Sequence, residues 1–217
     1  MNYNRLFLYM AVLMLLFAAC RKQWNATEED MANYGWSLYE QSEYLASYEW
    51  FSNSILEDEH YQDGYNGLGW SYGKLVELDS AIQAFEVGLT KPQNPRIVNI
   101  VAYDILAGLT FAHSALKHDS SAISYGDSLI WLISQQIGEK TWIFPHDSTT
   151  NYLDIHLTLA LSYYALSDFT ESLENVQDIK TALNPASPPY VVNTNTVQGR
   201  EELAAEIEYL QNYLQGR

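Results

Sequence analysis

Residues 62–90, QDGYNGLGWSYGKLVELDSAIQAFEVGLT, decide the fold of this chain. In the first half of this segment, apolar and small residues recur at intervals of three and four, which places them on one face of a helix. These residues are Tyr65, Leu68, Gly69 and Tyr72. A second stripe of the same kind follows a short interval and consists of Ala81, Ile82, Phe85 and Leu89. The segment therefore predicts two helices joined by a turn, with Gly69 and Ala81 small where the helices cross most closely.

The same pattern occurs 34 residues earlier, where Gly35-Trp36 aligns with Gly69-Trp70 and Phe51 aligns with Phe85. An aromatic residue, Leu-Gly, Tyr and then Ala-x-x-x-Phe at this period resembles the tetratricopeptide repeat, a helix-turn-helix unit of 34 residues. The alternative is two ordinary helical hairpins of similar length.

The resemblance implies an all-α superhelix of about four helix pairs plus a capping helix, over residues 28–217. The predicted ranges are 28–41 with 44–57, 61–76 with 78–90, 97–117 with 119–137, 149–166 with 169–183, and 197–215. The third pair is degenerate, because Asp104 stands at the place of the first aromatic residue and Gly126 at the place of the Phe. The last helix carries one apolar stripe that would cover the end of a solenoid, which is otherwise exposed. This stripe consists of Leu203, Ile207, Leu210 and Leu214.

The N-terminus has the features of a secretory signal. Arg5 precedes an apolar run of about 14 residues, 6–19, which is shorter than the ~20 residues that span a bilayer. The following Cys20 is the only cysteine, and residues 16–20 (LFAAC) resemble a bacterial lipobox in which Phe17 departs from the usual aliphatic residue. We therefore expect a lipoprotein signal peptide at 1–19, a lipidated tether at 20–27, and a location in the bacterial envelope, anchored to the outer membrane. An uncleaved anchor and a soluble secreted protein are the alternatives.

The composition argues against two classes of protein, disordered proteins and proteins that bind nucleic acids. Hydrophobic residues make up 47% of the chain, too many for a disordered protein. The net charge of -16 argues against binding a nucleic-acid backbone, which requires clustered Lys and Arg.

Candidate catalytic motifs are weak. Residues 126–129 (GDSL) reproduce the signature of the GDSL esterases, but in that family the Ser follows a strand near the start of the chain, whereas here it lies in a helical pattern. His113 and His118 are five residues apart, and we expect them on different sides of one helix. No metal-binding His pair and no Gly-rich phosphate loop occur, so we predict a protein that is not an enzyme and needs no metal or cofactor. A hydrolase with its site in the third unit and the irregular segment 141–147 is the alternative, although that segment also fits a loop folded onto the core.

The resemblance also implies a concave groove that binds a protein or peptide partner in the cell envelope. The groove positions carried over from the family are Trp36, Tyr39, Glu40, Asn66, Trp70, Gly73 and Lys74. Aromatic residues among polar neighbours suit such binding, although Trp36 and Trp70 could instead pack between adjacent helices. Gly67 and Gly73 have no place in the repeat signature, and Gly73 fits either a floor cleared for a ligand or close packing by bulky neighbours. A purely structural or oligomerising role is a further alternative.

Overall fold

The computed structural model describes residues 26–92, 100–136 and 141–216, so the predicted signal peptide, Cys20 and most of the tether lie outside the described residues. The described helices are α2 (Glu28–Glu40), α3 (Tyr44–Glu57), α4 (Gln62–Lys74), α5 (Leu78–Leu89), α6 (Ile100–Ala115), α7 (Asp119–Ser134), α8 (Tyr152–Ala165), α9 (Phe169–Leu183) and α10 (Val197–Gln215). The described part thus confirms the predicted all-α class and its order of helices.

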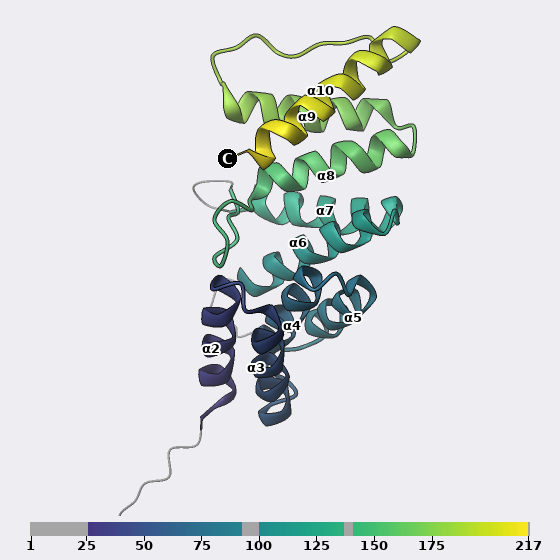
Figure 1. The fold of residues 1–217 in the computed structure, drawn as a ribbon. Coiled ribbons are helices and arrows are strands. Elements are labelled where there is room, and N and C mark those ends of the chain that lie inside the picture. Colours follow the sequence, from purple (N-terminus) through teal and green to yellow (C-terminus); the bar gives the residue numbers. More distant parts are fainter. Residues whose placement is uncertain (1–25, 93–99, 137–140, 217) are drawn as a thin grey trace, which may run out of the picture.

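The helices form four hairpins, α2–α3, α4–α5, α6–α7 and α8–α9, stacked in chain order with α10 across the last one (Figure 1). The first helix of each hairpin packs against the first helix of the next, so α2, α4, α6 and α8 form one layer of the stack. The direction of the hairpins changes along the stack, from α2 and α3 at one end to α8 and α9 at the other (Figure 1). The hairpins therefore form a superhelix rather than a flat row of helices.

Phe85 of α5 fixes the crossing of three helices. A Cβ atom placed on Gly69 of α4 would lie 2.5 Å from the Phe85 ring, and one on Gly108 of α6 would lie 2.2 Å from it. Both distances are far below van der Waals contact, so the ring fits only because both positions are glycine. The predicted close crossing at Gly69 is confirmed, and the degenerate third unit supplies the second glycine.

Phe51 of α3 is held in the same way one hairpin earlier, between Gly35 of α2 and Gly67 of α4. The Cβ distances to its ring would be 3.0 Å and 2.1 Å. Gly67, which has no place in the repeat signature, therefore has a packing role.

Local sequence fixes where helices begin. Thr27 and Asp30 form a capping box at the start of α2, and Asn151 and Asp154 form one at the start of α8. The second box explains why α8 begins at residue 152 rather than at the predicted 149.

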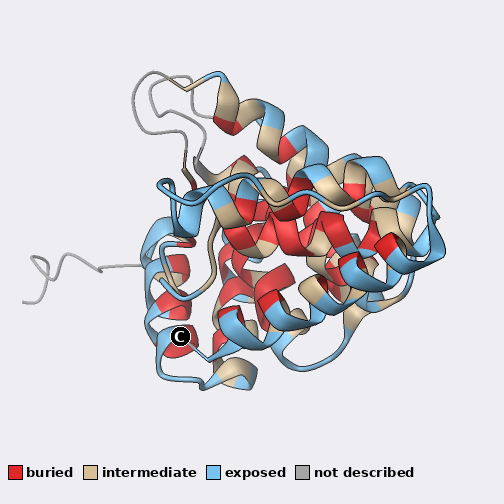
Figure 2. Ribbon diagram, turned by 90° about the horizontal axis from the view of Figure 1, so that it is seen from above, coloured by how far each residue is buried: buried red, intermediate tan, exposed pale blue. Residues whose placement is uncertain are grey.

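Buried residues gather between the helices and exposed ones on the outside, as Figure 2 shows in a view from above. One apolar cluster extends from α2 to α8 and includes Trp142 and Phe144, which precede α8. A second cluster joins α8, α9 and α10, and the predicted stripe of α10 is buried in it. The burial of this stripe agrees with the prediction that α10 covers the end of the stack of hairpins. None of the helices in the described ranges combines the length and apolar character needed to cross a membrane.

Each hairpin turn contains one non-glycine residue with a positive φ: Ser42, Val76, Lys117 and Ser167. Val76 is the least suited to this conformation, because it is β-branched and has a φ of 64°. Its side chain is 77% exposed, so little packing offsets the strain.

We predict that Val76→Gly raises the free energy of unfolding of residues 21–217 by about 1 kcal/mol, because glycine adopts this conformation without a steric cost. Val76→Ala keeps a Cβ atom and should give a clearly smaller gain. Urea unfolding monitored by circular dichroism measures both, and a lower stability for Val76→Gly would contradict the strain.

Candidate functional site

The segment between α7 and α8 lies on the layer formed by the first helices of the hairpins. We call residues 141–151 the α7–α8 loop; in Figure 1 it descends from the start of α8 toward α2. Burial alternates along it, with Trp142 and Phe144 buried and Ile143 and Pro145 exposed. This period of two is that of an extended backbone, whose successive side chains point to opposite sides.

Phe144 is the centre of the contact between this loop and the repeats. Its side chain is fully buried and stacks on Trp70 of α4, with ring centroids 4.1 Å apart and an interplanar angle of 22°. The edges of two α2 rings complete its surroundings, since Trp36 lies 5.9 Å and Tyr39 6.1 Å from it. Offset and edge-to-face geometries of this kind are the favoured arrangements of aromatic rings.

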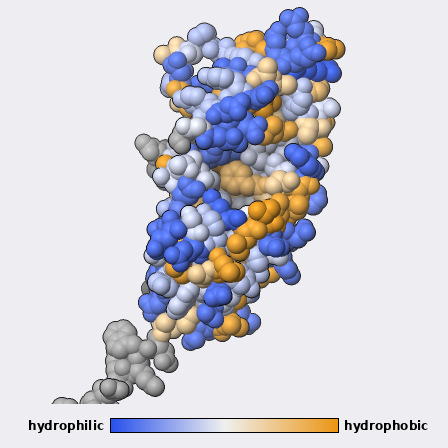
Figure 3. All heavy atoms as spheres, in the orientation of Figure 1, coloured by the Kyte–Doolittle hydropathy of each residue, from blue (hydrophilic) through white to orange (hydrophobic). Residues whose placement is uncertain are grey.

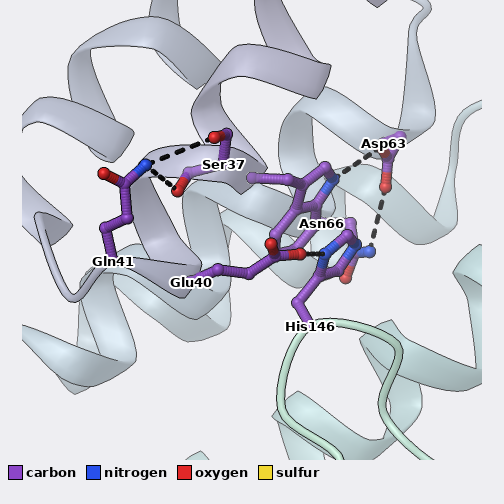
Figure 4. A network of polar contacts seen from close by, with 7 residues as sticks. Ser37, Glu40, Gln41, Asp63, Asn66 and His146 are labelled. Carbon is purple, nitrogen blue, oxygen red and sulfur yellow. Dashed lines mark hydrogen bonds and ion pairs between the residues drawn. The ribbon is translucent and has the colours of Figure 1, made fainter.

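Charged and polar contacts flank Phe144. The His146 ring stacks on Trp36 at 3.7 Å, and its Nδ1 lies 2.9 Å from Oε1 of Glu40 (Figure 4). Lys74 Nζ lies 3.5 Å from Asp147 Oδ2. Two residues of the loop are thus paired with groups of opposite charge, one on α2 and one on α4, when His146 is protonated.

Two tryptophan indoles reach carboxylates at the base of this site. Trp36 Nε1 donates to Asp63 at 2.8 Å, and Asn66 Nδ2 also donates to Asp63, at 3.1 Å (Figure 4). Trp142 Nε1 of the loop donates to Asp104 of α6 at 2.8 Å. Burial raises the pKa of Asp104 to about 7, although the hydrogen bond from Trp142 lowers it. Asp104, which departs from the repeat signature, is therefore the buried carboxyl group that receives the loop.

We predict that Asp104 contributes a fall in the stability of the protein as pH rises from about 4 to about 7, because the folded state keeps the Asp104 proton that the unfolded state has lost. Asp104→Asn is neutral at all pH values and still accepts a hydrogen bond from Trp142. It should remove most of this slope and be more stable than wild type at pH 8 by roughly 1–3 kcal/mol. Urea unfolding at pH 5 and pH 8 measures the difference, and an Asn variant that is less stable at pH 8 would show that the ionised carboxylate is required.

The structure brings together six of the seven predicted partner-binding residues, but around the chain's own loop. Five of them contact Phe144, His146 or Asp147 of the α7–α8 loop: Trp36, Tyr39, Glu40, Trp70 and Lys74. Asn66 is buried and is joined to Trp36 through Asp63, which accepts a hydrogen bond from each of them. The rings of Trp36 and Trp70 are buried, in agreement with the alternative that they pack in the core, and the loop is the segment they pack against.

Gly73, the seventh residue, differs from the other helical glycines. A Cβ atom at Gly73 would meet nothing within 4 Å, which removes close packing as a reason for this glycine. It opens onto an apolar cavity of about 220 Å³ between α4, α5 and α6, which we call the Gly73 hollow. Its lining includes Trp70, Lys74, Leu78, Phe85 and Phe111. A second hollow of about 330 Å³ shares Trp70 and Phe111 and is bordered by Thr149 and Leu214.

We predict opposite outcomes for two alanine substitutions in α4. Gly73→Ala should raise the free energy of unfolding, by up to about 1 kcal/mol, because alanine favours the helix and the new methyl group has room. Gly69→Ala should lower it by about 1–3 kcal/mol, because the methyl group would overlap the buried Phe85 ring. Thermal and urea unfolding measure both, and a destabilising Gly73→Ala would contradict the open hollow.

Some buried polar atoms in the described residues lack a hydrogen-bond partner there, and three of the five surround this site: the Tyr39 hydroxyl, Asn66 Oδ1 and Trp70 Nε1. Burial also raises the pKa of Tyr39, so its hydroxyl stays protonated. Each such group costs about 1–3 kcal/mol when it is buried unpaired.

The other candidate motifs have ordinary contacts. Ser128 lies in α7, and its hydroxyl donates to the Ser124 carbonyl oxygen at 2.7 Å, as serines in helices commonly do. The expectation that His113 and His118 lie on different sides of one helix is wrong. A turn separates α6 from α7, so His118 precedes α7 and its Nδ1 lies 3.4 Å from that of His113. Across the described residues, His, Cys, Asp and Glu form no group of three that could hold a metal ion.

This chain is similar to known proteins in its fold and not detectably in its sequence. No protein-family model and no curated protein matches the sequence. The structure is similar to a chain in the crystal structure of the APC/C hetero-tetramer Cut9-Hcn1, with a TM-score of 0.59 and 16% sequence identity. The match covers 84% of this chain, which spans only 30% of that chain. At this identity the likeness concerns the fold alone, and it supports the tetratricopeptide-like class of helical-hairpin superhelices.

The sequence did not reveal which segment of the chain packs against the predicted groove residues. The signal was present in residues 142–146, where aromatic residues alternate with Ile143 and Pro145. That alternation predicts an extended segment with one buried face. It does not identify which surface of the protein, about 70 to 110 residues away along the chain, covers that face.

Proposed function

We propose that this protein is a scaffold that binds a protein or peptide partner on its layer of first helices. The observation that carries the proposal is the Gly73 hollow, an apolar cavity beside a helical glycine that packing does not explain. Apolar cavities with few polar groups are the usual form of a binding site. In the orientation of Figure 1, hydrophobic residues gather in a diagonal band at the level of α5 and α6, whereas both ends of the molecule show a mixture of hydrophilic and hydrophobic residues (Figure 3). Binding, rather than catalysis, is the function that this surface supports.

The partner that fits is one that inserts an apolar side chain into the Gly73 hollow. Lys74 is the single charged residue of the lining, and it already contacts Asp147. The net charge of -16 favours a basic or neutral partner and faster association at low salt.

The partner is sought by capture from envelope membranes of the native host, with residues 21–217 as bait. Gly73→Met fills the hollow from a position where a side chain has room, so it should fold normally and weaken capture at least tenfold. Gly73→Ala is the matched control and should bind almost as well as wild type. Equal capture by the folded Met variant would show that the hollow is not the binding site.

We further propose that Cys20, the single cysteine of the sequence, carries a lipid that anchors the scaffold to the outer membrane of the bacterial envelope. Several acyl chains on one cysteine give a stable anchor, because each buried CH₂ contributes about 0.8 kcal/mol. Cys20→Ser should abolish metabolic labelling with palmitate and move the protein to the aqueous phase in detergent partition. Unchanged labelling and partition would contradict the anchor.

A further inference from the structure

We infer that the cleft beneath the α7–α8 loop is a receptor for an extended segment with aromatic side chains at alternate positions, and that residues 142–147 are its exchangeable resident. A partner segment with the pattern aromatic-x-aromatic-x-basic would bind by displacing them. This inference rests on the proposed binding function and specifies the chemistry of the partner.

The way the loop is attached supports exchange. In the described residues, its backbone hydrogen bonds stay within the loop and the start of α8: Phe144 N–H to the Thr150 carbonyl, and Tyr152 N–H to the Trp142 carbonyl. Contact with the repeats is made by side chains, namely the rings of Phe144 and His146, the indole of Trp142 and the carboxylate of Asp147. The loop can therefore leave the cleft without breaking a backbone ladder to any helix.

The fit of the resident is incomplete. The Tyr39 hydroxyl, Asn66 Oδ1 and Trp70 Nε1 remain without hydrogen-bond partners while the loop is in place. The carboxyl group of Asp104 is buried, and the loop contacts it through the Trp142 indole. An incoming segment that forms hydrogen bonds with the three unpaired atoms would remove the free-energy cost of burying them without partners.

The resident also indicates which side chain should follow the two aromatic residues. His146 lies flat on Trp36 with its Nδ1 against Glu40. An arginine at this position would stack on the indole and pair with the carboxylate permanently, whereas histidine is charged only when it is protonated.

The test supplies the resident segment from outside. In residues 21–217, the substitutions Trp142→Ser, Phe144→Ser and His146→Ser together empty the cleft. The probe is the blocked peptide TWIFPHDS, which is residues 141–148, and its affinity is measured by calorimetry. We expect the peptide to bind the emptied protein at least tenfold more tightly than wild type. A peptide with arginine at the position of His146 should bind several-fold more tightly still, and one with alanine at the position of Phe144 at least thirtyfold more weakly.

Absence of binding to an emptied protein that retains its helical circular dichroism would overturn the inference. The single variant Phe144→Ala covers the case in which the triple variant fails to fold. It should remain folded at 25 °C and gain thermal stability from the peptide. If Phe144→Ala also unfolds, the loop is a permanent part of the core and the inference is wrong. None of these outcomes depends on the Gly73 hollow, so the proposed function stands or falls separately.

Discussion

The packing of two phenylalanine rings against glycines is the constraint on which this structure depends. Phe51 and Phe85 each lie between glycines of two successive first helices, and a Cβ atom at Gly67, Gly69 or Gly108 would lie only 2.1–2.5 Å from one of these rings. Because each ring contacts both its own hairpin and the next, it sets the spacing and the crossing between hairpins. The layer formed by α2, α4 and α6, on which every candidate binding residue lies, is positioned by these two contacts.

That layer is divided into two parts by the α7–α8 loop. Over α2 and the middle of α4, Phe144 and His146 cover the aromatic residues, and the buried carboxyl group of Asp104 receives Trp142. Beyond Trp70, the surface remains open as the two hollows that share this residue with Phe111. Trp70 belongs to both parts, because its ring stacks on Phe144 of the loop and the residue also borders both hollows. Lys74 also belongs to both parts, since it lines the Gly73 hollow and lies 3.5 Å from Asp147 of the loop.

The fold could be predicted from the sequence because its determinants are local and repeat: the helical stripes, the capping residues and the Gly-Trp pairs 34 residues apart. The groove residues could also be placed together, because the repeat fixes their register. The loop that covers the groove residues could not be predicted, because the contact between Phe144 and Trp70 joins distant parts of the chain that share no periodicity. Gly67 and Gly73 show the same limit, since both look alike in sequence, yet one faces Phe51 and the other faces open space.

Hydrogen exchange at the amides of Phe144 and Tyr152 tests most directly whether the loop is an occupant of the cleft or part of the core. Both N–H groups are bonded only within the loop and the start of α8, so their exchange reports the opening of this segment. If the loop is exchangeable, these amides exchange with an opening free energy well below that of Leu68 in the middle of α4, whose exchange we expect to require global unfolding. Equal opening free energies at all three amides would show that the loop leaves the cleft only when the whole protein unfolds, and would contradict the account.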